Sequence, residues 1–178
     1  LQHQDGHSLV LASTVPAVQA YDPAFAFELG AIVKDGIDRM YGPDTPEADR
    51  DVIYYITLYN ENYPMPALPD HPEVSQEFER GAVRGLYRWK AAPDGTAHRA
   101  TILFSGVSHQ AATIAANELA EHYDVGVELW SATSYKRLRE EALDVERQNR
   151  LHPSAPQQQP LVTQLLETSS GPITAVSD

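Results

Sequence analysis

At 178 residues, 42% of them hydrophobic, the chain is long enough to bury a core, and its 21% charged residues do not suggest a disordered composition. The formal net charge of −12 argues against a nucleic-acid surface or an anionic membrane face, since both attract clustered Lys and Arg. No stretch reaches the roughly 20 apolar residues that a membrane helix needs, and no signal peptide is visible. The lack of cysteine excludes disulfides and fits a cytoplasmic protein.

The first residues carry two histidines, His3 and His7, on either side of Asp5-Gly6. Asp-Gly is typical of a turn, because glycine reaches positive φ without a Cβ clash. Both imidazoles are candidate catalytic groups, since neutral imidazole accepts a proton and imidazolium stabilises negative charge. The alternative is an exposed turn with two solvated histidines. Although the spacing also matches metal ligands on a helix, glycine disfavours a helix and no third ligand is near, so no metal site is predicted.

The next segment predicts a helix followed by a strand. Residues 9–12 suggest a short strand, and prolines then mark an extended connection. Asp22-Pro23 predicts the start of a helix over residues 23–41, with Asp22 as its N-cap. Gly42-Pro43 ends this helix. Its expected buried stripe is Phe25, Leu29, Ile32, Val33, Ile37 and Met40, and Gly30 and Gly36 either permit close packing against a sheet or weaken the helix.

Residues 52–59 form a β-branched and aromatic run that predicts a strand buried on both faces, the pattern of a parallel sheet. Asn60, Glu61 and Tyr63 lie just past its carboxyl end, where open α/β sheets bind ligands. They are therefore candidate ligand-binding residues, the alternative being an ordinary polar loop.

Four prolines in residues 64–72 predict a stiff linker between a first domain, residues 1–63, and a second, residues 73–178. In the second domain, Pro93-Asp94-Gly95 predicts a turn. A strand over 101–107, a helix over 108–123 and a strand over 125–130 predict a parallel crossover. The stripe expected to face the core of this helix is Ala111, Ile114, Ala115, Leu119 and Tyr123.

Ser134 is expected to cap a helix over 135–151 whose Arg and Glu residues indicate a solvated face. Residues 161–166 and 172–176 suggest a strand pair or a helix–strand unit. Dinucleotide, Walker and nucleophile-elbow motifs are absent from the sequence. The fold class predicted from the residues is thus α/β with parallel βαβ units.

Several long motifs resemble one family, the homodimeric, thiamine-diphosphate-dependent pyruvate dehydrogenases of bacteria. The first is Gln2-His3-x-Asp5-Gly6-His7-Ser8. The others lie at residues 11–14, 21–26, 54–57, 60–63, 130–134 and 149–153, so the resemblance spans nearly the whole chain. One departure is that some relatives carry a further histidine after the serine, where this chain has Leu9, so any role of that histidine is missing here.

The resemblance implies a fold and an activity. Residues 1–63 would end a pyrimidine-binding-type domain, and residues 73–178 would begin a transketolase C-terminal-like domain. The enzyme would decarboxylate pyruvate on thiamine diphosphate with Mg²⁺ and pass the acetyl group to the lipoyl-bearing dihydrolipoamide acetyltransferase component. His3 and His7 would be catalytic, and Asp5, Asn60, Glu61 and Tyr63 would bind substrate. The groups that hold the cofactor would lie upstream of this segment, which would act within a cytoplasmic homodimer.

Two alternatives remain open within this resemblance. The segment could serve only structure and dimerisation, or it could belong to a transketolase-like enzyme with another donor substrate. The sequence begins inside a motif and ends in an apolar run, so we expect a fragment that is inactive alone and prone to aggregate.

Overall fold

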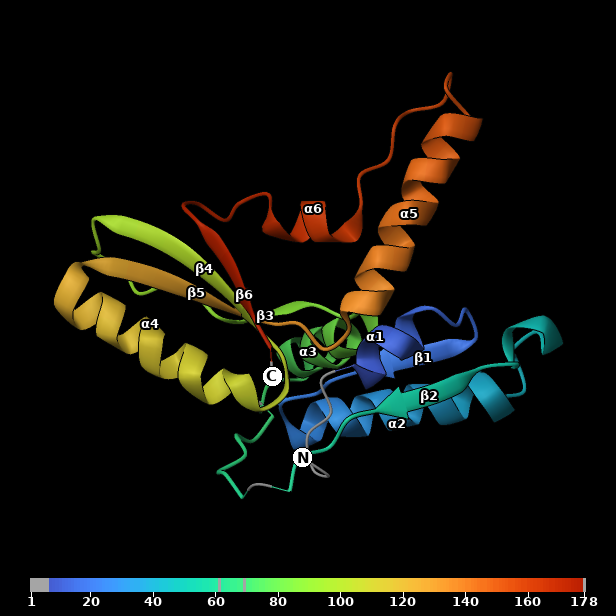
Figure 1. Cartoon of the computed structure of the whole chain (residues 1–178), viewed down its shortest axis with the longest axis horizontal. Helices are drawn as coiled ribbons and strands as arrows, with labels where there is room; N and C mark the ends of the chain where they lie inside the picture. The colour runs from blue at the N-terminus through green and yellow to red at the C-terminus, as the bar shows by residue number, and fades with distance from the viewer. Residues whose placement is uncertain (1–6, 61, 69, 178) are drawn as a thin grey trace.

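The computed structural model of the chain describes residues 7–60, 62–68 and 70–177. Its strands form a two-stranded parallel sheet and a four-stranded mixed sheet (Figure 1). None of the helices in these ranges is long and apolar enough to cross a membrane. In chain order the helices and strands are α1 (Ser8–Ser13), β1 (Val18–Tyr21), α2 (Ala26–Tyr41), β2 (Ile53–Ile56), α3 (Pro72–Arg84), β3 (Tyr87–Lys90), β4 (His98–Phe104), α4 (His109–Tyr123), β5 (Val125–Ser131), α5 (Tyr135–Leu151), α6 (Leu161–Leu166) and β6 (Ile173–Val176), with short 3-10 turns at Glu47–Asp49 and Gly106–Ser108.

The first sheet pairs β1 with β2 in parallel, with Val18 opposite Ile53 and Tyr21 opposite Ile56. The prediction of a parallel strand near residue 55 is confirmed, but the strand is shorter than expected and is not buried on both faces. Ile53 is 62% exposed, and the rest of β2 is only half-buried. The reason is that, within the described residues, β2 pairs only with β1, so its second edge and part of one face lack a cover.

Two predictions in the first forty residues are wrong. Residues 9–12 belong to the helix α1 and not to a strand, because the backbone closes into helical turns directly after His7. Asp22 does not cap α2, which begins at Ala26 with Phe25 as its N-cap. The segment Val18–Tyr21 before it is the strand β1, so Asp22 is the first residue after a buried strand.

The buried face of α2 is rotated from the predicted stripe. Phe25 and Ile32 are buried as expected, but Val33 and Ile37 are 42% and 53% exposed. Glu28 and Gly36 occupy the inner face instead. Gly36 packs against the ring of Tyr54, where an added Cβ would lie 3.3 Å from the ring carbons, so close packing is the correct interpretation of this glycine. No atom lies within 4 Å of a Cβ built on Gly30.

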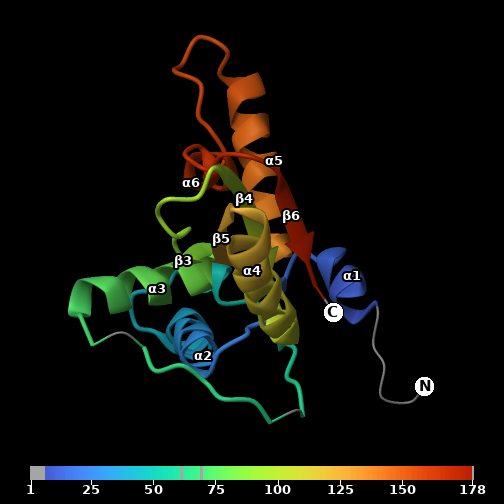
Figure 2. The same cartoon turned by 90° about the vertical axis from the view of Figure 1, so that its left-hand side faces the viewer.

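The second sheet has the order β3-β5-β4-β6, with β4 parallel to both β5 and β6 and with β3 antiparallel to β5. The predicted parallel crossover through α4 is confirmed. Successive side chains of these strands point to opposite faces of the sheet, so they belong to two different cores. Phe104 and Leu129 pack towards α4, whereas Leu103 and Trp130 pack towards α5 and α6. The helices therefore cover both faces of this sheet (Figures 1 and 2).

The predicted helix at α4 is confirmed, but its predicted buried stripe is mostly wrong, since of its members Leu119 packs against the core. The residues that α4 buries are His109, Ala112 and Ala116, while Ile114 and Tyr123 are 59% and 68% exposed. Two apolar stripes compete on this alanine-rich helix, and the one with the smaller side chains lies against the sheet. Small side chains let the helix backbone approach the large residues Phe25, Phe104 and Leu129.

Further predictions for the second half are confirmed. Residues 94–95 form the predicted turn, with Gly95 at φ +85°. The Ser134 hydroxyl accepts a hydrogen bond from the Arg137 backbone N–H and so caps α5. Of the two possibilities for the last segments, the structure has a helix–strand unit, α6 followed by β6.

A buried carboxylate, Glu28 of α2, joins the start of α2 to the second sheet. One carboxylate oxygen accepts hydrogen bonds from the backbone N–H groups of Ala24 and Phe25, at 2.6 and 2.9 Å. The other accepts from the Tyr87 hydroxyl of β3 at 2.6 Å and the Ser131 hydroxyl of β5 at 2.5 Å. The side chain is fully buried, and this burial raises the pKa of Glu28, although all four bonds oppose the rise.

Shortening Glu28 should destabilise the fold far more than neutralising it. We expect Glu28→Ala to lower the free energy of unfolding by roughly 2–5 kcal/mol, because a buried donor left without an acceptor costs about 1–3 kcal/mol. Glu28→Gln should remain within about 1.5 kcal/mol of the parent, because the amide oxygen can face the backbone N–H groups while the hydroxyls of Tyr87 and Ser131 accept from its NH₂. Urea titrations of the chain measure both values, and equal losses would contradict this account.

The raised pKa of Glu28 also predicts a pH dependence. The Glu28 carboxyl group holds its proton more tightly in the folded chain than in the unfolded chain. The protonated group therefore contributes fully to the free energy of unfolding below the unfolded pKa near 4.5, and this contribution is lost as pH rises through the folded pKa. We therefore expect the stability of the parent relative to Glu28→Gln to fall as pH rises above about 4.5. Paired urea titrations across this range test it, and a constant difference would contradict it.

Candidate functional site

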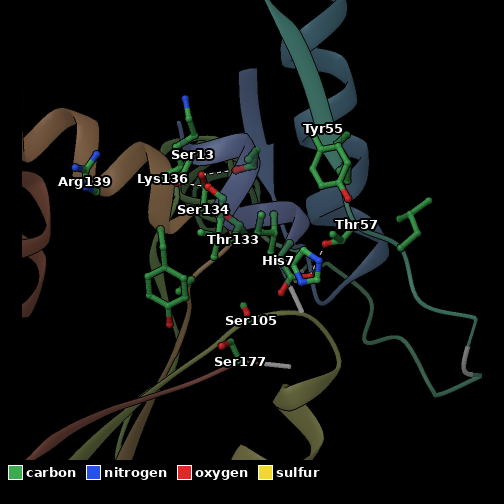
Figure 3. A pocket seen from close by; sticks show the side chains of 18 of the residues that line it. His7, Ser13, Tyr55, Thr57, Ser105, Thr133, Ser134, Lys136, Arg139 and Ser177 are labelled. Atoms are coloured by element: carbon green, nitrogen blue, oxygen red, sulfur yellow. Dashed lines mark hydrogen bonds between the residues drawn. The ribbon is translucent and has the colours of Figure 1, made fainter. Parts of the chain in front are cut away.

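A cavity of about 680 Å³ lies where the carboxyl ends of strands from both sheets meet. This is the edge at which open α/β sheets bind ligands. In Figure 3, His7, Tyr55 and Thr57 lie on one side of the cavity and Lys136 and Arg139 on the other. The lining comes from α1, the ends of β1 and β2, the residues after β4, β5 and β6, and the first turns of α5, and consists of His7, Leu9, Val10, Ser13, Ala20, Asp22, Tyr55, Ile56, Thr57, Leu58, Tyr59, Ser105, Ala132, Thr133, Ser134, Tyr135, Lys136, Arg139 and Ser177.

Asp22 connects four strand ends beneath this cavity and is only 6% exposed. One of its carboxylate oxygens accepts hydrogen bonds from the hydroxyls of Thr57 at 2.6 Å and Tyr59 at 2.9 Å, both beyond β2. Its backbone N–H donates to the Thr133 carbonyl beyond β5, and its carbonyl accepts from the Gly106 N–H beyond β4. Asp22 thus fixes the relative positions of the two sheets where the cavity opens.

Gly106 is packed against this carboxylate in a left-handed conformation, with φ +49°. A Cβ at this position would lie 2.5 Å from the Tyr59 hydroxyl and 2.7 Å from an Asp22 carboxylate oxygen. Both the backbone angle and the close approach therefore require glycine.

Hydroxyl and cationic groups form the other side of the cavity. The Ser134 hydroxyl donates to the Ala20 carbonyl at 2.6 Å, which holds the start of α5 against β1. The buried Lys136 ammonium donates to the Val18 carbonyl and to the Glu140 carboxylate, each at 2.6 Å. Burial raises the pKa of the Tyr135 hydroxyl, and the nearby Asp22 carboxylate adds to the rise, so this hydroxyl keeps its proton and can donate it in a hydrogen bond.

Of the predicted site residues, His7 lines the cavity. It is exposed and stands at the N-cap of α1, where the chain enters the helix. His3, Asp5 and Glu61 lie outside the described residues, so the predictions for them stay predictions. Asn60 is exposed and does not line the cavity.

Tyr63 also lies away from the cavity lining. Its hydroxyl donates to the Ala24 carbonyl at 2.9 Å, and its ring centroid lies 4.8 Å from that of His109. His109 is itself buried, and its burial lowers the pKa of the imidazole. These contacts hold the segment after β2 against the start of α2 and α4.

Sequence reasoning missed most of the cavity. The sequence predicts Asp22 and Ser134 as helix caps, and it assigns no site role to the polar residues that follow the strands of the second sheet. A signal was present, since Ser105 follows β4 directly and Thr133 and Ser134 follow β5 within three residues. Applying the strand-end rule to every predicted strand, and not only to residues 52–59, would have selected them.

The described residues do not by themselves fit a magnesium–diphosphate group. Among them, no group of three or more His, Cys, Asp or Glu side chains is arranged to hold a metal ion. The cavity lining contains one carboxylate, Asp22, and one of its oxygens already accepts two hydroxyl hydrogen bonds. Hard cations such as Mg²⁺ prefer several oxygen ligands, so any such group would need ligands from other residues.

The arrangement defines a class, an α/β protein with a polar cavity at the carboxyl ends of its parallel strands. The comparisons with known proteins give the family. Residues 1–66 match the family model described as "Pyruvate dehydrogenase E1 component middle domain". Over 178 residues the chain is 46% identical to the "Pyruvate dehydrogenase E1 component" of Mycobacterium tuberculosis, 45% to that of Mycolicibacterium smegmatis and 38% to that of Escherichia coli.

Residues 1–66 are thus similar to the pyruvate dehydrogenase E1 middle domain, and the alignment to the relatives continues through the rest of the chain. The matches cover all of this chain but only 18–19% of the length of these relatives. The resemblance recognised in the sequence motifs is therefore confirmed.

The packing at Gly106 makes a testable prediction. Gly106→Ala should lower the free energy of unfolding by roughly 3 kcal/mol or more, because left-handed backbone costs about 1–2 kcal/mol for an L-residue and the new methyl group collides with Tyr59 and Asp22. Gly95→Ala is the matched control, since Gly95 also has positive φ but an added Cβ would meet nothing within 4 Å. Gly95→Ala should lower the free energy of unfolding only by the cost of the left-handed backbone. Urea titrations compare the two, and equal effects would contradict the packing argument.

Proposed function

We propose that the protein containing this chain is the E1 component of a pyruvate dehydrogenase. It would decarboxylate pyruvate on thiamine diphosphate and transfer the acetyl group to a lipoyl group. The observation that carries this proposal is the 45–46% identity along all 178 residues to proteins of that name, together with the middle-domain match over residues 1–66. Because the chain spans less than a fifth of those relatives, the activity is proposed for the whole protein and not for this segment alone.

We propose that His3 and His7 are this segment's catalytic groups. The exposed position of His7 at the cavity supports this role, since an imidazole there can give or accept a proton and can hydrogen-bond to a carboxylate or carbonyl oxygen. Thr57, Ser105 and Ser177 also line the cavity and carry hydroxyls of the kind that orient such oxygens. Asp5, Asn60, Glu61 and Tyr63 remain proposed substrate-binding residues, with Asn60 and Tyr63 lying outside the lining.

Thiamine diphosphate, held with Mg²⁺ mainly by residues outside this chain, would supply the carbanion chemistry. The proposed partners are a second copy of the protein in a homodimer, pyruvate, and the lipoyl-bearing dihydrolipoamide acetyltransferase component, in the cytoplasm. The isolated segment is proposed to be inactive.

We also propose the domain division at the proline-rich segment 64–72. The middle-domain match ends at residue 66, β1 and β2 precede the segment, and β3 to β6 all follow it. Residues 1–63 would end the pyrimidine-binding-type domain, and residues 73–178 would form part of a transketolase C-terminal-like domain.

Replacing the histidines separately in the full-length protein tests the catalytic assignment. We expect His3→Asn and His7→Asn each to slow acetyl transfer to lipoamide by at least ~100-fold, the usual effect of removing a general acid–base group. His122→Asn is the matched control, since His122 is exposed on α4 and does not line the cavity. It should leave the rate unchanged.

Circular dichroism spectra of the variants should overlay that of the parent. Near-normal rates for both His3→Asn and His7→Asn would overturn the assignment and leave the segment a structural role. Cleavage of a ketose phosphate donor with transfer of its two-carbon unit to an aldose acceptor, and no decarboxylation of pyruvate, would instead favour a transketolase-like enzyme.

A further inference from the structure

A second cavity lies on another side of the second sheet and shares no lining residue with the first. It has a volume of about 470 Å³, within the range of small-molecule sites. Its walls come from α3, β3, Trp130 of β5 and the end of α6, and its lining consists of Glu73, Glu77, Arg80, Gly81, Arg84, Leu86, Tyr87, Arg88, Trp130, Leu165 and Thr168.

Three arginines from two different elements line this cleft. Arg80 and Arg84 lie one turn apart on α3, and Arg88 comes from β3. Like charges at this helical spacing destabilise a helix by about 0.2–0.5 kcal/mol. The concentration of cations contrasts with a chain whose formal net charge is −12.

The guanidinium groups of this cleft are largely uncompensated by the protein. Among the ion pairs of the described ranges, none involves Arg80 or Arg84. Arg80 donates only a long bond of 3.4 Å to the Gln76 carbonyl of its own helix. One nitrogen of Arg88 lies 3.5 Å from the Glu128 carboxylate.

Glu128 also accepts hydrogen bonds from other groups, which weakens its ionic interaction with Arg88. Its second oxygen accepts hydrogen bonds from the Trp130 indole at 3.2 Å and the Ser169 hydroxyl at 2.9 Å. This anchoring holds Arg88 at the cleft and leaves its remaining donors available. A guanidinium has five N–H donors, so one loose contact satisfies a small part of it.

The two glutamates of the lining cancel this charge only in part, since three arginines face two carboxylates. Glu73 lies in the first turn of α3, where a carboxylate stabilises the helix dipole, and Glu77 follows one turn later. The arginines lie towards the other end of the same stripe, beside the apolar side chains Leu86 and Leu165. All three arginines are exposed, so their guanidinium groups are accessible to a ligand from solvent.

We propose that this cleft binds a small organic anion, a phosphate ester or a polycarboxylate, through Arg84 and Arg88, with Arg80 at its rim. Planar guanidinium groups match the oxygen geometry of phosphate and carboxylate, and two of them from different elements can hold two acceptor groups of one ligand. The Thr168 hydroxyl is a further donor at the cleft. This site goes beyond the proposed activity and does not depend on it.

Calorimetric titration of the cofactor-saturated, full-length protein tests the proposal, with pyrophosphate and citrate as probes at constant ionic strength. We expect saturable binding with a Kd below about 1 mM for at least one probe. Tighter binding of pyrophosphate would assign ligands with phosphate groups, and tighter binding of citrate would assign polycarboxylates. Arg84→Gln and Arg88→Gln should each weaken binding at least ~10-fold, the effect of losing a hydrogen bond to a charged group.

Arg147→Gln is the matched control, since Arg147 is exposed on α5, lines neither cavity and loses the same charge. It should change the Kd less than about 2-fold, whereas Glu77→Gln should tighten binding by removing a negative charge from the cleft. If Arg84→Gln, Arg88→Gln and Arg147→Gln weakened binding equally, the attraction would be non-specific and the site would be overturned. Absence of saturable binding to either probe would overturn it as well, while leaving the acetyl-transfer activity unaffected.

Discussion

The burial of the Glu28 carboxylate is the constraint on which the rest of the structure depends. A carboxylate cannot leave water without several donors around it, and here the donors come from the backbone before α2 and from two strands of the second sheet. The hydrogen bonds to this one carboxylate therefore fix where the N-terminal unit, which comprises β1, α2 and β2, lies against the second sheet. The Phe25 ring, which packs on Trp89 and His109 beside it, adds apolar contact to the same junction.

The junction determines the shape of the cavity. With α2 held in place, Asp22 reaches the residues beyond β2, β4 and β5 at once, through its carboxylate and both of its backbone groups. The strand ends of two separate sheets then surround one space, which neither sheet encloses alone. The proposed catalytic position of His7 follows from this geometry, because α1 carries it to the rim of that space.

The sequence predicted the positions of helices and strands better than it predicted which face of each helix is buried. Parallel strands near residues 55, 103 and 127, the helix between the last two and the cap at Ser134 follow from periodicity and capping chemistry. The inner faces of α2 and α4 did not, because those helices bury Glu28 and small alanines, which hydrophobicity does not select. Asp22 was misassigned for a similar reason: its partners lie 35 to 111 residues further along the chain, and local patterns carry no information on such contacts. The motif carrying His7 was recognisable, whereas the cavity around it was not.

Native-state hydrogen exchange of the Ser131→Ala variant is the most direct test of the coupling between the two sheets. Ser131 belongs to β5 of the second sheet, yet its hydroxyl donates to Glu28 of the N-terminal unit. If the buried carboxylate joins the sheets into one cooperative unit, the opening free energy should fall equally for amides of β1, α2 and β5. A loss of protection confined to β5 and its neighbouring strands, with β1 and α2 unchanged, would contradict this account.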